Sequence, residues 1–254
     1  MKRDALSRLC GLLLAAAALS WQAAALGQAD YAREKRWAAE ITPSILLGDA
    51  VYLELKSGHK FLAIYTPSPK AAAGVITVHG IGVHPDHGLI NPLRSELAEQ
   101  GYTTLSVQMP VLAAEARGDD YPPLFPEAAE RLQAAIAFLR AKGLKRIAIV
   151  SHSMGSRMTN DFLSRVAEHG VNAWVAVGLS GEFTRPESFR APVLDLYGEK
   201  DLPAVLDNAA KRAAAIKAVR GSGQVQVAGA DHFFTGVRGE LVRQVKLFLD
   251  ARLK

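Results

Sequence analysis

RIAIVSHSMGSRM, residues 146–158, is the stretch that decides the fold of this chain. Its apolar run IAIV is typical of a buried β-strand, and after SHSMG apolar residues recur every four positions from Met158, as on one face of a helix. Between strand and helix, Ser153 has a small residue two positions away on each side, Ser151 and Gly155. This spacing predicts a sharp turn that strains the backbone at Ser153 and projects its hydroxyl beyond the sheet.

The turn resembles the nucleophile elbow of the α/β-hydrolase superfamily, whose usual form is G-x-S-x-G. Here Ser151 replaces the first glycine, and serine is nearly as small. Small residues let the strand and the helix approach closely, and the helix N-terminus behind the serine favours developing negative charge. The resemblance implies an α/β-hydrolase fold in which Ser153 is the nucleophile.

The rest of the chain alternates predicted strands and helices. Residues 51–56 and 60–65 alternate apolar and polar side chains around a Ser-Gly turn, which predicts an antiparallel hairpin at a sheet edge. Further strands are expected at 75–78, 103–108, 147–150, 173–179, 192–197 and 224–228. Helices are expected at 30–40, from Asn91 as N-cap to Gly101, at 127–142, from the elbow to about 169, at 204–220 and at 241–249. This order indicates the α/β class, with a mostly parallel central sheet and helices on both faces.

The composition fits one globular domain. The chain has 254 residues and 49% hydrophobic content, which is enough for one sizeable core. Its net charge of +5 comes without a run of like charges, so the sequence predicts no nucleic-acid surface. The sequence shows no internal repeat, and only residues 180–191 lie where many superfamily members insert a cap. We therefore expect no sizeable cap domain, and an open site bordered by the loop 109–125.

Residues 1–27 are predicted to be a secretory signal peptide. Lys2, Arg3 and Arg8 precede a short apolar stretch, and the small residues that follow fit cleavage after Ala25 or Gly27. The apolar stretch is shorter than the roughly 20 residues that span a membrane, which favours cleavage over an uncleaved anchor. The remaining α/β-hydrolase domain, residues 28–254, is then expected to be periplasmic or secreted, without a stable membrane span.

The only cysteine of the chain, Cys10, lies within this leader. Arg8 and Leu9 precede it, whereas lipidation requires small residues there, so the sequence argues against a lipid anchor. The mature chain would then contain no disulfide, which a core of this size does not need.

A serine nucleophile needs an orienting acid, and the strand at 192–197 leads to one candidate. It is followed by GEKDLP, which places Asp201 where the superfamily keeps its acid after the nucleophile. Asp195 lies inside the strand and is a less accessible rival, and Glu182 follows the preceding strand. The plain structural alternative is that Asp201 caps a turn or the following helix.

The candidate base is His232, in the segment GADHFF between the last predicted strand and the last helix. That loop is where the superfamily keeps its catalytic histidine. Other histidines are placed less well: His59 lies in a hairpin turn, His169 at a helix end, and His152 at the variable position of the elbow.

The segment HGIG after the strand at 75–78 resembles the loop that supplies an oxyanion N–H in this superfamily. The resemblance implies that Ile81 supplies one N–H and that Met154, the residue after the nucleophile, supplies the other. The alternative is a glycine turn that only permits close packing. His79 is expected to brace this loop.

A metal site in the same loop is the main rival within hydrolases. His79, His84, Asp86 and His87 lie close in sequence, but a zinc motif of the form H-x-H-x-D-H is broken by Gly82 at its first position. No distal ligand series completes a zinc shell, so we expect neither a metal nor a cofactor. Asp86 and His87 are expected at the rim of the site or in a solvated loop.

Arg157 is unusual because a cation in the first turn of a helix opposes the helix dipole. A salt bridge to a nearby carboxylate is the simpler explanation. Contact with an anionic group of a substrate is the alternative.

Longer segments extend the resemblance over nearly all of the mature chain. HGIGVHPDHGLINPLRSELAEQGYTTLSVQMP, LDLYGEKDLPAV and AGADHFF are similar to one exported bacterial branch of the superfamily, which lacks a lid and has no assigned activity. The implied function is a serine hydrolase that cleaves a carboxylic ester or thioester bond of a small or surface-presented substrate. Amide or small-lactone cleavage stays open, as does a non-catalytic envelope module that keeps the fold and binds a partner. The sequence carries no signal of oligomeric state.

Overall fold

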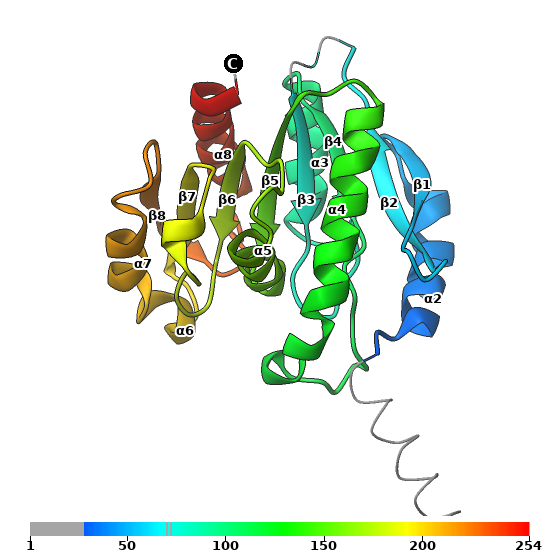
Figure 1. Cartoon of the computed structure of the whole chain (residues 1–254), viewed down its shortest axis with the longest axis horizontal. Helices are drawn as coiled ribbons and strands as arrows, with labels where there is room; N and C mark the ends of the chain where they lie inside the picture. The colour runs from blue at the N-terminus through cyan, green and yellow to red at the C-terminus, as the bar shows by residue number, and fades with distance from the viewer. Residues whose placement is uncertain (1–27, 70, 72, 254) are drawn as a thin grey trace, which may run out of the picture.

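The computed structural model describes residues 28–69, 71 and 73–253, so the predicted leader lies outside the described residues. Within this part of the chain, eight strands form one sheet in the order β1-β2-β4-β3-β5-β6-β7-β8 (Figure 1). Their bounds are β1 (Asp49–Glu54), β2 (Lys60–Thr66), β3 (Ala73–Val78), β4 (Thr103–Val107), β5 (Arg146–His152), β6 (Ala173–Val177), β7 (Val193–Lys200) and β8 (Gly223–Asp231).

The sheet is parallel except at one edge. β1 pairs antiparallel with β2, and β2 pairs antiparallel with β4. From β4 to β8 all neighbouring strands are parallel. The central strands β3 and β6 are buried along their whole length, as expected for a sheet covered on both faces. This confirms the predicted mostly parallel sheet with an antiparallel hairpin.

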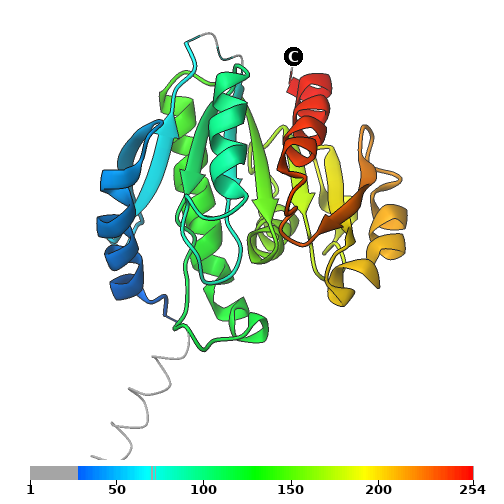
Figure 2. The ribbon, with the colours of Figure 1, turned by 180° about the vertical axis from the view of Figure 1, so that it is seen from behind.

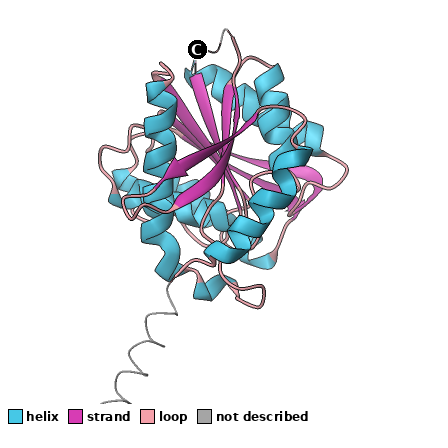
Figure 3. Ribbon diagram, turned by 90° about the vertical axis from the view of Figure 1, so that its right-hand side faces the viewer, coloured by secondary structure: helices cyan, strands magenta, loops and turns pink. Residues whose placement is uncertain are grey.

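Helices cover both faces of the sheet (Figures 1 and 2). The α-helices are α2 (Tyr31–Ile41), α3 (Ile90–Glu99), α4 (Phe125–Ala141), α5 (Met154–Arg165), α6 (Pro203–Leu206), α7 (Ala209–Ile216) and α8 (Arg238–Leu253). Short 3-10 helices lie at Thr42–Ser44, Gly118–Asp120, Pro122–Leu124 and Pro186–Ser188. α4 and α5 pack over one face, and α3 and α8 pack over the other. On each face the buried side chains of the helices and the sheet form a separate apolar cluster. Figure 3 shows the twist of the strands between these layers.

The order of the strands indicates where a ligand crevice would form at the edge of this sheet. The chain runs from β3 outward to β4, and then crosses back past β3 to form β5 on its other side. The loops that leave β3 and β5 at their carboxyl ends therefore diverge at adjacent strands. Open α/β sheets bind ligands at this kind of reversal. In this chain the two loops are the HGIG segment and the elbow.

Three predictions about the helices are wrong. Asn91 is not the N-cap of α3, because the helix begins at Ile90 and the Asn91 side chain donates to Asp86 instead. The elbow helix α5 ends at Arg165 rather than near residue 169. The single helix expected at 204–220 is two helices, α6 and α7. The Asn208 side chain donates to the Ala204 carbonyl, which a continuous helix would pair with the Asn208 backbone.

None of the helices in the described part of the chain combines the length and the apolar character needed to cross a membrane.

Candidate functional site

The elbow forms where β5 ends and α5 begins. Ser153 has φ 54° and ψ −117°, a region that non-glycine residues rarely adopt and that costs about 1–3 kcal/mol. The surrounding structure fixes this conformation, because the Ser153 N–H donates to the Val177 carbonyl at 2.9 Å. A side chain at Gly155 would bring its Cβ to 2.4 Å from the His79 carbonyl oxygen. Glycine at position 155 therefore lets α5 lie against β3.

Serine at the first small position of the elbow has a structural role that glycine would lack. The indole Nε1–H of Trp174, which is fully buried on β6, donates to Ser151 Oγ at 2.8 Å. The Ser156 hydroxyl lies 3.1 Å from the same oxygen. Ser151 thus satisfies a buried donor that would otherwise lose a hydrogen bond, at a cost of about 1–3 kcal/mol.

The structure brings Ser153, His232 and Asp201 together. His232 Nδ1 lies 2.5 Å from Asp201 Oδ1, and His232 Nε2 lies 2.9 Å from Ser153 Oγ. An ionised carboxylate only accepts hydrogen bonds, so Nδ1 carries the proton and Nε2 accepts the serine hydroxyl proton. The imidazole is therefore in the tautomer that a general base requires.

Asp201 is held as a carboxylate although it is buried. Its oxygens accept the backbone N–H of Leu202 at 2.8 Å and of Gly198 at 3.2 Å, besides the His232 imidazole. Burial alone would raise the pKa of Asp201, but the hydrogen bond to His232 and these backbone donors outweigh it and lower the pKa below its usual value. Asp201 thus carries the charge that orients His232.

Gly178, at the end of β6, makes room for the histidine. It has φ +57°, and a Cβ there would lie 3.0 Å from His232 Cε1. A side chain at this position would compete with the imidazole for space. The sequence does not reveal this role of Gly178, because a lone Gly-Leu-Ser after a strand gives no signal of contact with a histidine 54 positions further along the chain.

The HGIG segment lies against the elbow. A Cβ at Gly80 would lie 3.4 Å from Ser153 Cβ, and Ile81 and Ser153 line the same cavity. Met154 is the first residue of α5, so its N–H has no acceptor within the helix. The His79 side chain braces the loop: its Nε2 accepts the Met109 N–H at 2.9 Å, and its Nδ1 donates to the Gly80 carbonyl. Burial lowers the pKa of His79 to about 3, so the ring is neutral.

Arg33 on α2 is a second residue that the sequence did not reveal. Its guanidinium donates to the Gly82 carbonyl at 3.1 Å and to the Leu112 carbonyl at 2.7 Å. It therefore ties the loop after β3 to the loop after β4 at the same edge of the sheet. A single arginine in an alanine- and charge-rich helix has no pattern that predicts this contact.

The rival acids lie elsewhere. Asp195 is fully buried and pairs with Arg212, whose Nε lies 2.8 Å from Asp195 Oδ2. Glu182 forms an exposed pair with Lys211. Neither carboxylate is hydrogen-bonded to His232.

In the histidine-rich loop after β3, some residues have a structural role and others line the site. Asp86 does not line the cavity that contains Ser153, and it accepts hydrogen bonds from Asn91 and Arg94 of α3 instead. His87 does line the cavity that contains Ser153. Among residues 28–69, 71 and 73–253, no three His, Cys, Asp or Glu side chains lie in an arrangement that could hold a metal ion.

Arg157 forms no salt bridge with any described residue, so that expectation is wrong. Arg157 Nη1 donates to the Gly118 carbonyl at 3.0 Å, and the guanidinium lies over the ring of Phe125. Arg157 therefore ties α5 to the loop between β4 and α4.

A cavity of about 320 Å³ opens over Ser153 and His232. Three apolar side chains at its border are unusually exposed: Ile81 at 38%, Leu202 at 48% and Phe233 at 58%. They come from the loop after β3, the loop after β7 and the loop after β8. Isolated exposed apolar residues are common, but three around one hydroxyl indicate a surface that contacts an apolar group.

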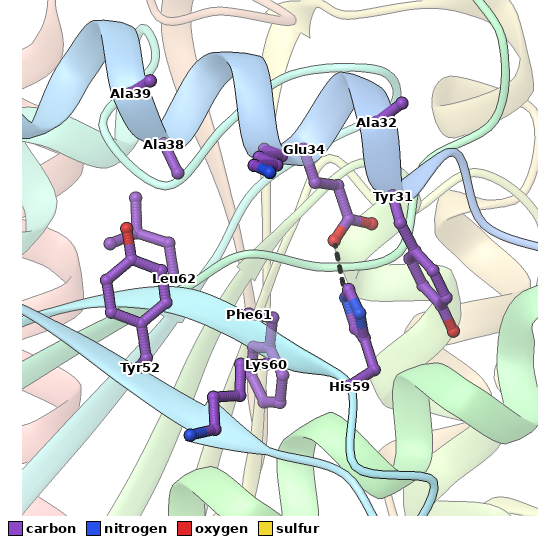
Figure 4. A pocket seen from close by; sticks show the side chains of 11 residues that line it. Tyr31, Ala32, Glu34, Ala38, Ala39, Tyr52, His59, Lys60, Phe61 and Leu62 are labelled. Carbon is purple, nitrogen blue, oxygen red and sulfur yellow. Dashed lines mark ion pairs between the residues drawn. The ribbon is translucent and has the colours of Figure 1, made fainter.

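A second cavity, of about 690 Å³, lies between α2 and the β1–β2 hairpin and contains none of these residues (Figure 4). In Figure 4 the Glu34 carboxylate points from α2 toward His59, 3.7 Å away. The same carboxylate binds the buried Arg131 guanidinium, which also pairs with Glu127. One guanidinium thus serves two carboxylates. Burial, against the opposing effect of Arg131, raises the pKa of Glu34 to about 7.

We expect the stability of the fold to fall as the pH rises from about 4.5 to about 7, through Glu34. In this window the folded chain holds a proton on Glu34 that the unfolded chain has lost, so raising the pH favours unfolding. Glu34→Gln should flatten the slope of the free energy of unfolding against pH, measured by urea denaturation. Glu240→Gln is the control, because the pKa of Glu240 is lowered to about 2 and lies outside the window. An unchanged slope in Glu34→Gln would contradict this assignment.

Solved structures of hydrolases have a similar fold. A dienelactone hydrolase from Anabaena variabilis matches with a TM-score of 0.68 at 19% identity, over 81% of this chain and 97% of that chain. An esterase from Pyrococcus furiosus matches with a TM-score of 0.66 at 17% identity, over 81% and 93% of the two chains. A Butyrivibrio proteoclasticus protein with ferulic acid bound gives 0.66 at 15% identity, over 80% and 99%. No protein-family model and no curated protein sequence matches the chain. At these identities the similarity concerns the fold.

Proposed function

Because the chain has the α/β-hydrolase fold, we propose that it is a serine hydrolase that cleaves an ester-type bond, either a carboxylic ester or a thioester. The observation that carries the proposal is the continuous hydrogen-bond chain from Asp201 through His232 to Ser153, at the floor of an open cavity. A turn-forming or capping role for Asp201 alone would not require its bond to the imidazole. The esterases and hydrolases among structures of the same fold add support.

In the proposed mechanism, water is the second reactant, and all catalytic groups are side chains or backbone N–H groups of this chain. Ser153 Oγ attacks the carbonyl carbon while His232 Nε2 takes its proton, and the N–H groups of Ile81 and Met154 bind the oxyanion. His232 then gives the proton to the leaving group, and an acyl group remains on Ser153. In the second half-reaction water attacks the acyl carbonyl carbon while His232 Nε2 takes a proton from it. The imidazolium then returns this proton to Ser153 Oγ, and the acid product leaves. Asp201 stabilises the imidazolium that forms in each half-reaction.

The cavity favours an uncharged acyl group of modest size. Its volume of about 320 Å³ is at the lower end of the roughly 300–1,000 Å³ typical of ligand pockets. Imidazoles are its only titratable side chains, and Ile81, Leu202 and Phe233 give it an apolar border. Arg157 is engaged with Gly118, and it is absent from the residues that line this cavity.

We propose that this activity lies outside the cytoplasm, on the strength of the predicted leader. A basic start, a short apolar stretch and a small-residue exit in residues 1–27 support export to the periplasm or the medium. The substrate would then be a small ester, or an ester presented at a surface, in that compartment.

Labelling with a fluorophosphonate tests the proposal directly. The folded wild-type chain at neutral pH should form one covalent adduct, which peptide mass mapping assigns to Ser153, because only an activated serine reacts rapidly. A panel of neutral esters of graded acyl length should then show turnover that is highest for short apolar chains. Absence of labelling, or an adduct on another serine, would contradict the assignment and favour a non-catalytic binding module.

A further inference from the structure

We propose that His152, the variable residue of the elbow, is a positioning residue that holds the loop of the base in register with the nucleophile. The proposal deepens the proposed function, on which its kinetic part rests. His152 immediately precedes Ser153 at the end of β5, so its side chain is carried by the same backbone as the nucleophile.

The first contact of His152 is with the backbone of the base itself. His152 Nε2 lies 2.9 Å from the carbonyl oxygen of His232. A carbonyl only accepts, so Nε2 carries a proton and donates it. This bond is buried and joins residues 80 positions apart. It ties the backbone of His232 to the residue next to Ser153, and therefore sets the distance that the His232 ring must span.

The ring of His152 also contacts the neighbouring side chains of the site. Its centroid lies 4.7 Å from that of His232 and 6.0 Å from that of Phe233. On another side, a Cβ at Gly80 would lie 3.3 Å from His152 Nδ1, so the absence of a side chain at Gly80 gives this ring its space. One imidazole thus contacts the base loop through His232 and Phe233, and it occupies the space left free by the missing side chain of Gly80.

The base loop needs such a restraint because its own backbone is strained. Phe234, two residues after the base, has φ 52° although it is not glycine. The Asp231 carboxylate accepts the N–H groups of Phe233 and Thr235, which fixes the solvent side of the loop. The His152 bond to the His232 carbonyl fixes its inner side. Together these contacts hold the conformation that points His232 Nε2 at Ser153.

His152 performs this role as a neutral ring. Burial, with a smaller contribution from the neighbouring His232, lowers the pKa of His152 to about 4. At neutral pH the ring therefore adds no positive charge beside His232, and its replacement changes geometry without removing a charge. Any change in the behaviour of His232 after a substitution at His152 therefore reports a change in its position.

Two variants separate the hydrogen bond from the volume of the ring. His152→Leu fills similar space without a donor, and His152→Gln keeps an N–H that reaches the His232 carbonyl. We expect His152→Leu to lower kcat about 10- to 100-fold with little change in KM, because a small misplacement of the base affects the transition state most. The acid limb of the kcat/KM profile should move to lower pH, because a looser pair with Asp201 stabilises imidazolium less. His152→Gln should recover most of both effects.

His169→Leu is the matched control, because His169 is also buried but accepts a bond from the Val171 N–H after α5, outside the site. It should lower the melting temperature without changing the pH profile. The NMR signal of the His232 Nδ1–H, which bonds to Asp201, gives a readout that needs no turnover: it should move upfield or broaden in His152→Leu and recover in His152→Gln. If wild-type Ser153 is not labelled by a fluorophosphonate, the proposed function fails while this NMR signal still decides the role of His152. An unchanged His232 Nδ1–H signal in His152→Leu, or equal effects of Leu and Gln, would overturn the proposal.

Discussion

Ser153→Ala is expected to lower kcat for ester hydrolysis by about a million-fold, the scale seen when a serine nucleophile of this type is removed. The reason is that the acyl-enzyme cannot form, and His232 Nε2, now without the Ser153 hydroxyl at 2.9 Å, can only assist water. A residual rate of about 10³–10⁴ over the uncatalysed reaction should survive, from the N–H groups of Ile81 and Met154 and from substrate binding. Steady-state kinetics on the best ester of the panel, with single-turnover measurements, provide the test.

Ser164→Ala is the control for this substitution, because Ser164 lies near the far end of the same helix and its hydroxyl donates to Asp161. It should leave kcat within a few-fold of wild type. Retention of more than about a hundredth of wild-type kcat by Ser153→Ala would be incompatible with a serine nucleophile, given the losses known for such enzymes.

Asp201→Asn should lower kcat by about 10⁴-fold while the fold is kept. The carboxylate accepts three donors: the His232 Nδ1–H and the N–H groups of Leu202 and Gly198. An asparagine amide brings a donor of its own into this group and carries no charge. When its NH₂ faces His232, the ring proton moves to Nε2 and the base is lost. In either orientation the imidazolium loses its stabilising partner.

Asp195→Asn distinguishes this effect from the loss of any buried aspartate. Asp195 pairs with Arg212 and does not contact His232, so its substitution should lower the free energy of unfolding and leave kcat per folded molecule unchanged. Parallel urea denaturation and kinetics on both variants would separate the two results. If Asp195→Asn were the variant with the large loss of kcat, the acid would have been assigned to the wrong strand position.

The sequence predicted the architecture because its signals are local. Apolar runs, alternation and Gly or Pro at turns mark the strands and most helices, and the short linker 180–191 predicted that no cap follows β6. The elbow, Asp201 and His232 were identified because the superfamily keeps them at fixed places relative to strands, and the structure brings them within hydrogen-bond distance. Their catalytic role stays a prediction.

The rest of the site depends on contacts between segments far apart in sequence. Gly178 and Arg33 have no pattern of their own, and each matters only through a loop that folds against it. His152 stands at the variable position of the elbow, so no motif points to it, although it binds the base loop. The break between α6 and α7 at Asn208 likewise depends on which acceptor its side chain finds.

The bond between Trp174 and Ser151 changes how the elbow would have to be transplanted into another scaffold. Grafting SHSMG alone would bring a buried hydroxyl without the indole on β6 that donates to it, and restoring the usual glycine in this chain would remove the acceptor of that indole. The portable unit is therefore the pair of neighbouring strands β5 and β6, with the turn at their shared end. A graft of the five residues SHSMG alone would leave out Trp174, the residue that donates to Ser151.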